Sequence, residues 1–187
     1  YGKNTIGGAI NVITQKPTNE FRGDAAVLYG NLGFDQESLT VSGPIVADKV
    51  LALVSALHKS RDGYIYNRFT KKDINGYEGE GIRGRVLVMP IEGLKLDFSG
   101  DYYHQDGAEA LQTVSYVPLP FPPFNAQPTP DPVRRIVDLN APIAGERKVW
   151  GGAARADYDL PGVRLTALLG YREYTSRFQD DSDGLQL

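Results

Sequence analysis

The residue types that most often carry out chemistry are scarce in this sequence. It contains no Cys, two His and no Gly-x-Ser-x-Gly motif, which excludes thiol nucleophiles, Cys-based zinc sites and the usual serine-hydrolase nucleophile. His58 is expected on a strand and His104 at a loop entrance beside Tyr102 and Tyr103, where it could meet a ligand. Neither His has a plausible pair of metal ligands within four residues. We therefore predict no enzyme, no catalytic residue, no cofactor and no metal site.

An acidic stretch near the end of the sequence carries part of a calcium-loop pattern. Asp181, Asp183 and Gly184 stand at the third, fifth and sixth positions of such a loop. The first position is Gln179, and the twelfth, which needs Glu, would lie beyond Leu187. We therefore interpret the stretch as a solvated acidic loop.

Composition limits the class of protein. The 20 basic and 23 acidic residues give a net charge of -3, so no footprint for nucleic acid is present. The longest apolar run, Val50 to Val54, is far shorter than the roughly 18 to 20 residues of a transmembrane helix. The 21 Gly and 11 Tyr among 187 residues favour strands over helices. The length suits one soluble domain of about 150 to 200 residues, which is the first interpretation to test.

The elements that would position these residues are strands. Apolar and polar residues alternate in seven segments, which predicts strands with one apolar and one polar face. In the third segment, Leu51, Leu53 and Leu57 would form the apolar face, with Val50, Ala52 and Val54 opposite. The segments are 21–29, 36–43, 50–58, 82–88, 94–102, 150–160 and 163–172.

The connections between these segments differ in length. Residues 43–49, 90–93 and 161–162 are short and carry turn residues, whereas the connections at about 59–77 and 105–148 are long. In an up-and-down sheet the short turns would share one end and the long loops the other, as in outer-membrane barrels. Asn31-Leu32-Gly33 is an exception, a tight turn at the loop end.

Aromatic residues concentrate near the long-loop ends of the segments. Placement at one membrane interface, as an aromatic girdle, would account for this position. The residues are Tyr29, Phe34, Tyr64, Tyr66, Tyr77, Tyr102, Tyr103, Tyr171 and Tyr174.

The most specific motif opens the sequence. It reads Tyr1-Gly2-Lys3-Asn4-Thr5-Ile6-Gly7-Gly8-Ala9-Ile10-Asn11-Val12-Ile13-Thr14-Gln15-Lys16-Pro17. This stretch closely resembles the end of the plug domain of TonB-dependent outer-membrane receptors, with matches at Tyr1, Gly2, Asn4 to Thr14, Lys16 and Pro17. The resemblance continues to about residue 104, and beyond Gln105 it rests on strand–loop alternation alone.

The resemblance implies a fold and a function. The fold would be all-β: an antiparallel transmembrane β-barrel segment, about 7 of 22 strands, with the C-terminal end of a plug domain. Residues 1–18 would end the plug and residues 19–187 would begin the barrel, so the sequence is expected to be an internal fragment. The function implied is TonB-dependent active uptake of a ferric siderophore, haem, cobalamin or an oligosaccharide across the outer membrane of a Gram-negative bacterium.

The resemblance also implies partners. These would be the TonB/ExbB/ExbD complex, reached through an N-terminal box that this sequence lacks, the nutrient ligand, and outer-membrane lipid and lipopolysaccharide. The protein is expected to be a monomer that binds no nucleic acid.

The residues with expected roles are structural, and no ligand-binding residue is assigned. Gly7 and Gly8 would allow tight backbone passage, and Asn4 and Asn11 would hydrogen-bond the plug near the barrel wall. The full plug-end set is Gly2, Asn4, Thr5, Gly7, Gly8 and Asn11. The charges expected to face plug or water inside the barrel are Arg83, Arg85, Asp97 and Asp101.

Two other classes remain open from the sequence. A passive porin-type barrel would lack a plug and a TonB box. A soluble all-β binding domain would fold without detergent, because seven alternating segments also fit a sandwich.

Overall fold

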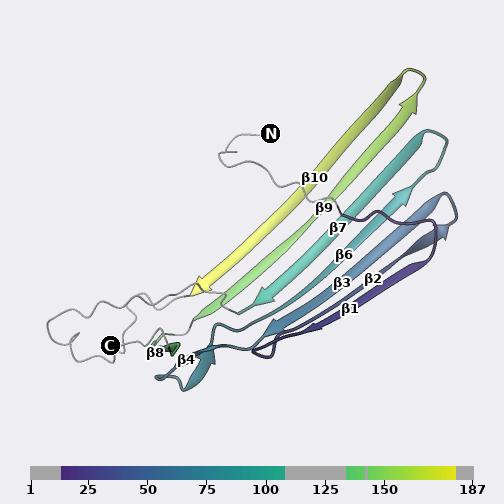
Figure 1. Ribbon diagram of the computed structural model, residues 1–187. Coiled ribbons are helices and arrows are strands. Elements are labelled where there is room, and N and C mark those ends of the chain that lie inside the picture. The colour runs from purple at the N-terminus through teal and green to yellow at the C-terminus, as the bar shows by residue number, and fades with distance from the viewer. Residues whose placement is uncertain (1–13, 108–133, 142, 180–187) are drawn as a thin grey trace.

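The computed structural model describes residues 14–107, 134–141 and 143–179, and all regular elements in these ranges are strands (Figure 1). No helix in the described ranges is long and apolar enough to cross a membrane. The strands are β1 (Arg22–Tyr29), β2 (Asp35–Val46), β3 (Val50–Arg61), β4 (Ile65–Asn67), β5 (Lys72–Ile74), β6 (Tyr77–Val88), β7 (Leu94–Asp106), β8 (Ile136–Val137), β9 (Ala144–Leu160) and β10 (Val163–Gln179).

Seven strands form one antiparallel sheet in the order β1-β2-β3-β6-β7-β9-β10. Each strand pairs with the next long strand of the chain, so the sheet is an up-and-down meander. The prediction of an all-β fold with an antiparallel sheet of seven strands is confirmed. A second, smaller sheet has the order β5-β4-β8, and its β4–β8 pair is parallel.

The two ends of the large sheet differ, as the connection lengths predicted. The turns β2–β3, β6–β7 and β9–β10 gather at one end, and the small sheet lies in the longer connections at the other (Figure 1). Gly93 and Gly162 have φ of 80° and 78° in two of these turns, a left-handed conformation that glycine adopts without a steric penalty. We call the two ends of the sheet the turn end and the loop end.

Cross-strand partners point to the same side of a sheet, so the register separates two faces. The polar face carries the charges that the alternation placed together, among them Arg83, Arg85, Asp97 and Asp101. The opposite, apolar face carries large hydrophobic residues that are exposed. These include Val27, Leu39, Val54, Ile82, Phe98, Leu165 and Leu169.

The expected apolar face of β3 is wrong. Leu51 and Leu53 pair with Leu87 and Arg85, so they lie on the polar face, and Val54 lies on the apolar one. Both Leu side chains are nevertheless buried, at 6% and 5% exposure. The physical reason is a chain segment that crosses the polar face: Thr18 donates its backbone N–H to Ser42 Oγ at 2.9 Å, and Ser42 pairs directly with Leu53.

The large sheet has no partner layer within the described residues. Its apolar face packs against no other element there, and the four buried hydrophobic residues of the described ranges fall in two places. Leu51 and Leu53 lie beneath the crossing segment, whereas Val137 and Leu139 lie in the small sheet's region. Within the described residues the large sheet is therefore a single layer, which we call the wall.

Candidate functional site

Arg85 joins the polar face to the segment that precedes β1. Its Nε and one terminal nitrogen donate to the two carboxylate oxygens of Asp97 at 2.8 and 2.6 Å. Its other terminal nitrogen donates to the backbone carbonyls of Thr14 and Gln15 at 3.1 and 2.9 Å. A guanidinium can do both because its donors form a planar fork. Arg85 thus fixes residues 14 and 15 against the wall.

Two further contacts hold this segment near the turn end. Thr18 bonds to Ser42 on β2, and Asn19 bonds to the β2–β3 turn. In the turn, Asp48 donates its N–H to Asn19 Oδ1 at 2.9 Å and accepts from Nδ2 at 2.5 Å. We call residues 14–20 the crossing segment.

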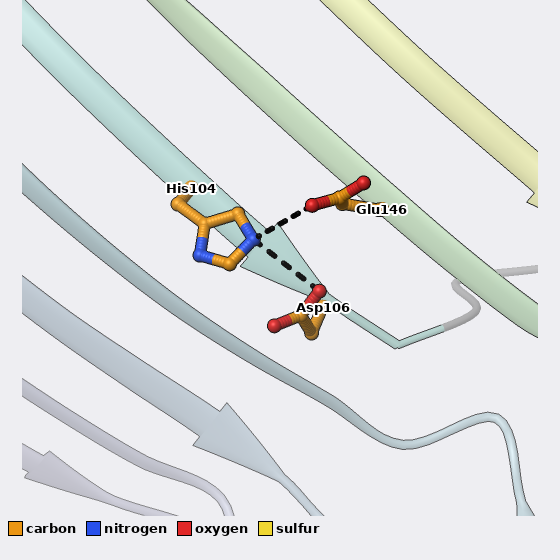
Figure 2. A group of neighbouring side chains, drawn as sticks. All are labelled: His104, Asp106 and Glu146. Atoms are coloured by element: carbon orange, nitrogen blue, oxygen red, sulfur yellow. Dashed lines mark ion pairs between the residues drawn. The ribbon is translucent and has the colours of Figure 1, made fainter.

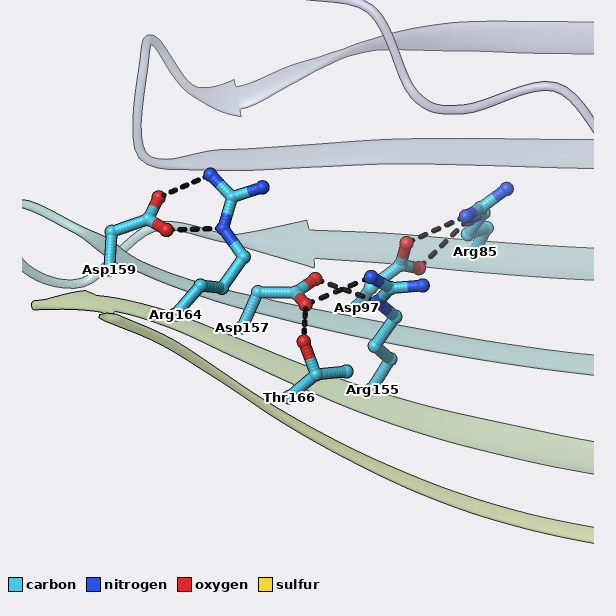
Figure 3. A network of polar contacts seen from close by, with 7 residues as sticks. All are labelled: Arg85, Asp97, Arg155, Asp157, Asp159, Arg164 and Thr166. Atoms are coloured by element: carbon cyan, nitrogen blue, oxygen red, sulfur yellow. Dashed lines mark hydrogen bonds and ion pairs between the residues drawn. The ribbon is translucent and has the colours of Figure 1, made fainter. Parts of the chain in front are cut away.

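A ladder of ion pairs continues from Arg85 across the polar face to the turn end (Figure 3). Arg155 donates to both carboxylate oxygens of Asp157 at 2.7 and 2.9 Å, and Thr166 donates to Asp157 at 2.7 Å. Arg164 pairs with Asp159 beside the β9–β10 turn. The ladder lines a cavity of about 380 Å³ to which Lys16 of the crossing segment also contributes. The polar face is therefore charged, and the Arg155 and Arg164 side chains of the ladder are exposed to solvent.

At the loop end, the polar face carries cations stacked on tyrosine rings. Lys59 Nζ lies 4.9 Å from the centre of the Tyr77 ring and 5.9 Å from that of Tyr103. The Arg61 guanidinium lies 4.9 Å from the Tyr77 ring and 5.0 Å from the Tyr64 ring. We call this the cationic–aromatic cluster; its members are Lys59, Arg61, Tyr64, Tyr77, Tyr103 and Arg135, which lies 5.3 Å from Tyr64.

Glycines on β6 make room for the cluster. A Cβ at Gly79 would come within 2.7 Å of the Tyr103 hydroxyl, and one at Gly81 within 3.1 Å of its ring. The ring therefore lies across these two positions, where its hydroxyl donates to the buried Gln105 Oε1 at 2.6 Å. Tyr103 is held in one orientation.

Buried polar groups hold the region of the small sheet together at the loop end. Asn67, 2% exposed, bonds through its side chain to the backbone N–H and C=O of Leu139 at 3.1 and 2.9 Å. Arg68 pairs with Asp138, which is also 2% exposed. Residues about 70 positions apart are thereby joined, which positions Arg135 beside Tyr64.

The apolar face ends, toward the loop end, in aromatic and then charged residues. Tyr102 and Trp150 are cross-strand partners, and the Trp150 and Tyr171 rings are 5.1 Å apart. Beyond them lie two rows that we call the charged belt. One row is Glu37, His58, Glu80, His104 and Lys148; the next is Asp35, Ser60, Glu78, Asp106, Glu146 and Arg177.

The belt brings His104 between two carboxylates (Figure 2). Asp106 follows it on the same strand, and Glu146 comes from β9. A hydrogen bond from Lys148 lowers the pKa of Glu146, and Arg177 adds to the effect. The same bond raises the pKa of Lys148. Sequence reasoning missed this group because Glu146 is about 40 residues away and only the β7–β9 register aligns the two strands.

An antiparallel meander with one apolar and one polar face occurs in β-barrel walls as well as in soluble sheets. Among solved structures, the ferric yersiniabactin uptake receptor FyuA from Yersinia pestis has the same fold, with a TM-score of 0.75 at 17% sequence identity. The match covers 94% of this chain and 26% of that receptor's chain, so this chain spans about a quarter of the receptor's length. No family model matches the sequence.

Some of the charged residues with expected roles lie in the described part of the chain. Arg85 contacts the crossing segment, and Asp101 accepts a hydrogen bond from Arg172 at 2.8 Å. The plug-end set Gly2, Asn4, Thr5, Gly7, Gly8 and Asn11 lies outside the described residues, as do residues 180–184 of the acidic stretch.

The predicted aromatic girdle needs correction. Tyr102 and Tyr171 lie on the apolar face, but Tyr77 and Tyr103 lie on the polar face, where they pack with Lys59. Neighbouring strand residues point to opposite sides, so proximity to the loop end did not determine the face. Trp150 was absent from the predicted set. Together with Tyr102 and Tyr171 it forms what we call the aromatic group.

Proposed function

We propose that this chain is the plug end and first barrel segment of a TonB-dependent receptor in the outer membrane of a Gram-negative bacterium. Its function would be energised uptake of a ferric siderophore or a similar scarce nutrient. The observation that carries the proposal is the placement of the crossing segment on the polar face, opposite the exposed apolar face. A plugged barrel requires this arrangement, with lipid outside and plug inside. The shared fold with an uptake receptor supports it.

The proposed domain boundary lies near the end of the crossing segment, shortly before β1 begins at Arg22. Residues 1–18 would end the plug, and 19–187 would form the barrel strands and loops. In this arrangement Arg85 ties the last plug residues to the wall, since it binds the carbonyls of Thr14 and Gln15. A pull by the TonB/ExbB/ExbD complex on a box upstream would then displace the plug ahead of Thr14 while its end stays fixed.

The cationic–aromatic cluster would meet the incoming ligand. It lies on the inward face at the loop end, where an external ligand arrives first. Lys59, Arg61 and Arg135 carry positive charge, and the tyrosine rings supply flat apolar surface. Such a surface fits an anionic chelate, because cations attract its charge and rings stack on its planar groups.

The alternatives fit the described residues less well. A passive porin-type barrel has no plug, so it would give no role to the contacts of Arg85, Ser42 and Asp48 with the crossing segment. A soluble all-β domain would have to cover the apolar face with a second layer.

The test is uptake by the full natural chain in a strain deleted for it. Radiolabelled ferric chelates of several chemical classes, haem and cobalamin would be offered with and without the chromosomal tonB gene. We expect accumulation of at least one of them that disappears without TonB. Uptake that persists without TonB would support a passive barrel, and wild-type uptake of every nutrient by the deletion strain would contradict the proposal.

A further inference from the structure

His104 presents a ring nitrogen to two carboxylates without making a hydrogen bond to either. Its Nε2 lies 3.3 Å from Asp106 Oδ1 and 3.6 Å from Glu146 Oε1. Within the described part of the chain this nitrogen is shielded from solvent and has no hydrogen-bond partner. Figure 2 shows the two ion pairs that run from this nitrogen to one oxygen of each carboxylate. A polar atom that is shielded and makes no hydrogen bond calls for an explanation.

The two distances from His104 are close to the spacing of ligands around one metal ion. The candidate donor atoms all lie within 4.8 Å of one another. At bond lengths of about 2.1 Å, two ligands of a tetrahedral ion are about 3.4 Å apart. The two distances from His104 fall on either side of that value, so small side-chain movements would bring all three atoms into coordination.

We propose that His104, Asp106 and Glu146 form a binding site for a divalent transition-metal ion, with Zn²⁺ as the best-suited ion. One imidazole nitrogen with two carboxylate oxygens is a donor set that zinc accepts, and the imidazole disfavours Mg²⁺ and Ca²⁺. The remaining coordination position would be open to water or an external ligand. The site lies on the apolar-face side of the sheet, away from the cationic–aromatic cluster, and does not depend on the proposed uptake function.

Lys148 is the main competitor for the ion. Its ammonium group pairs with Glu146 Oε1, the oxygen that faces His104, while Arg177 binds the other oxygen at 3.1 Å. An entering dication would displace Lys148 from Oε1. Removal of the Lys148 charge should therefore strengthen binding, which a purely structural ion-pair cluster would not do.

The chain provides a matched control in its other histidine. His58 stands in the same row of the belt, two strands away from His104. It lies 3.7 Å from Asp35 but belongs to no group of three candidate ligands among the described residues. The two histidines thus occupy the same row of the charged belt, but only His104 is proposed to bind the metal ion.

The experiment is zinc titration of the full natural chain in detergent by isothermal calorimetry. Wild type should bind one Zn²⁺ more per chain than His104→Ala or Glu146→Gln, or bind that ion at least about tenfold more tightly. His58→Ala should match wild type, Lys148→Gln should bind more tightly, and excess Mg²⁺ should not displace the ion. X-ray absorption of the zinc-loaded wild type should show nitrogen and oxygen ligands at about 2.0 to 2.2 Å.

Two results would overturn the proposal. One is equal zinc binding by wild type and His104→Ala, which would leave the three side chains as an ion-pair cluster. The other is loss of the same ion in His58→Ala, which would place the site elsewhere in the belt. Because zinc binding is measured without transport, failure here leaves the uptake proposal untouched.

Discussion

Arg85 bonds both to Asp97 on the neighbouring strand and to the crossing segment. Its side chain is 14% exposed and that of Asp97 is 15% exposed, so the pair is largely shielded from water. The Arg85 guanidinium also donates to two backbone carbonyls of the crossing segment. Removal of the guanidinium would leave a shielded carboxylate and two acceptors without these partners, which costs more than the loss of an exposed ion pair.

Arg85→Ala should lower the free energy of unfolding of the full natural chain by about 1–3 kcal/mol. Arg85→Lys should cost less, because it keeps the charge but loses the paired geometry. Urea unfolding in detergent micelles or lipid vesicles measures both changes. Arg22→Ala is the control, since Arg22 forms an exposed pair with Glu20 and should change stability by no more than about 0.5 kcal/mol. Equal effects of Arg85→Ala and Arg22→Ala would contradict the anchoring role.

At the scale of elements, glycines allow close approach between strands at particular positions. Gly151 on β9 is buried, and a Cβ there would come within 2.6 Å of the Tyr171 backbone carbonyl on β10. A Cβ added to Gly84 on β6 would have no atom within 4 Å among the described residues. The two glycines thus differ in packing although both lie within strands.

Gly151→Ala should destabilise the protein by about 1–3 kcal/mol, because backbone atoms must move to admit the methyl group. Gly84→Ala should be neutral or slightly stabilising, since alanine restricts the unfolded chain without a clash. Urea unfolding curves of the two variants measure both changes in the free energy of unfolding. If Gly84→Ala proves as destabilising as Gly151→Ala, the β9–β10 packing described above is incorrect.

The sequence predicted the middle of each long strand better than its loop end. Alternation identified β7 well, because Leu96, Phe98 and Tyr102 face one way throughout. It missed the first residues of β6 and β9, since Glu78, Glu80 and Glu146 put charge on the side that is apolar further along. A pattern based on one environment cannot follow a strand that passes from an apolar environment into a charged one.

Contacts between distant parts of the chain could not be predicted from the sequence, for a different reason. The group at His104 depends on the β7–β9 register, and the anchor at Arg85 on side-chain bonds to residues about 70 positions away. Leu51 and Leu53 were assigned to the wrong face because side-chain type alone does not show that the crossing segment covers them. The small sheet was missed altogether, since β4, β5 and β8 are only two or three residues long.

At the scale of the whole molecule, the large sheet separates two environments. The polar face holds ion pairs, the crossing segment and a cavity. The apolar face exposes residues such as Phe98, Leu165 and Leu169, at 46%, 54% and 74%. Burial of each such side chain is worth about 1.5–3 kcal/mol, so lipid contact would stabilise a surface that water does not. The aromatic group and the charged belt then mark where this apolar region ends.

The central claim is that the apolar face contacts lipid and the polar face contacts water. Single cysteines can test it on β7, because the 187 residues contain no Cys. Nitroxide labels would be attached in turn to Leu96→Cys and Phe98→Cys on the apolar face and to Lys95→Cys and Ser99→Cys on the polar face. The full natural chain would be reconstituted in lipid vesicles, and collisions with oxygen and with a water-soluble nickel chelate would be measured by electron paramagnetic resonance. We expect labels at 96 and 98 to meet oxygen and avoid the chelate, and labels at 95 and 99 to show the reverse. Equal access of the chelate to all four positions, or the opposite alternation, would contradict the account.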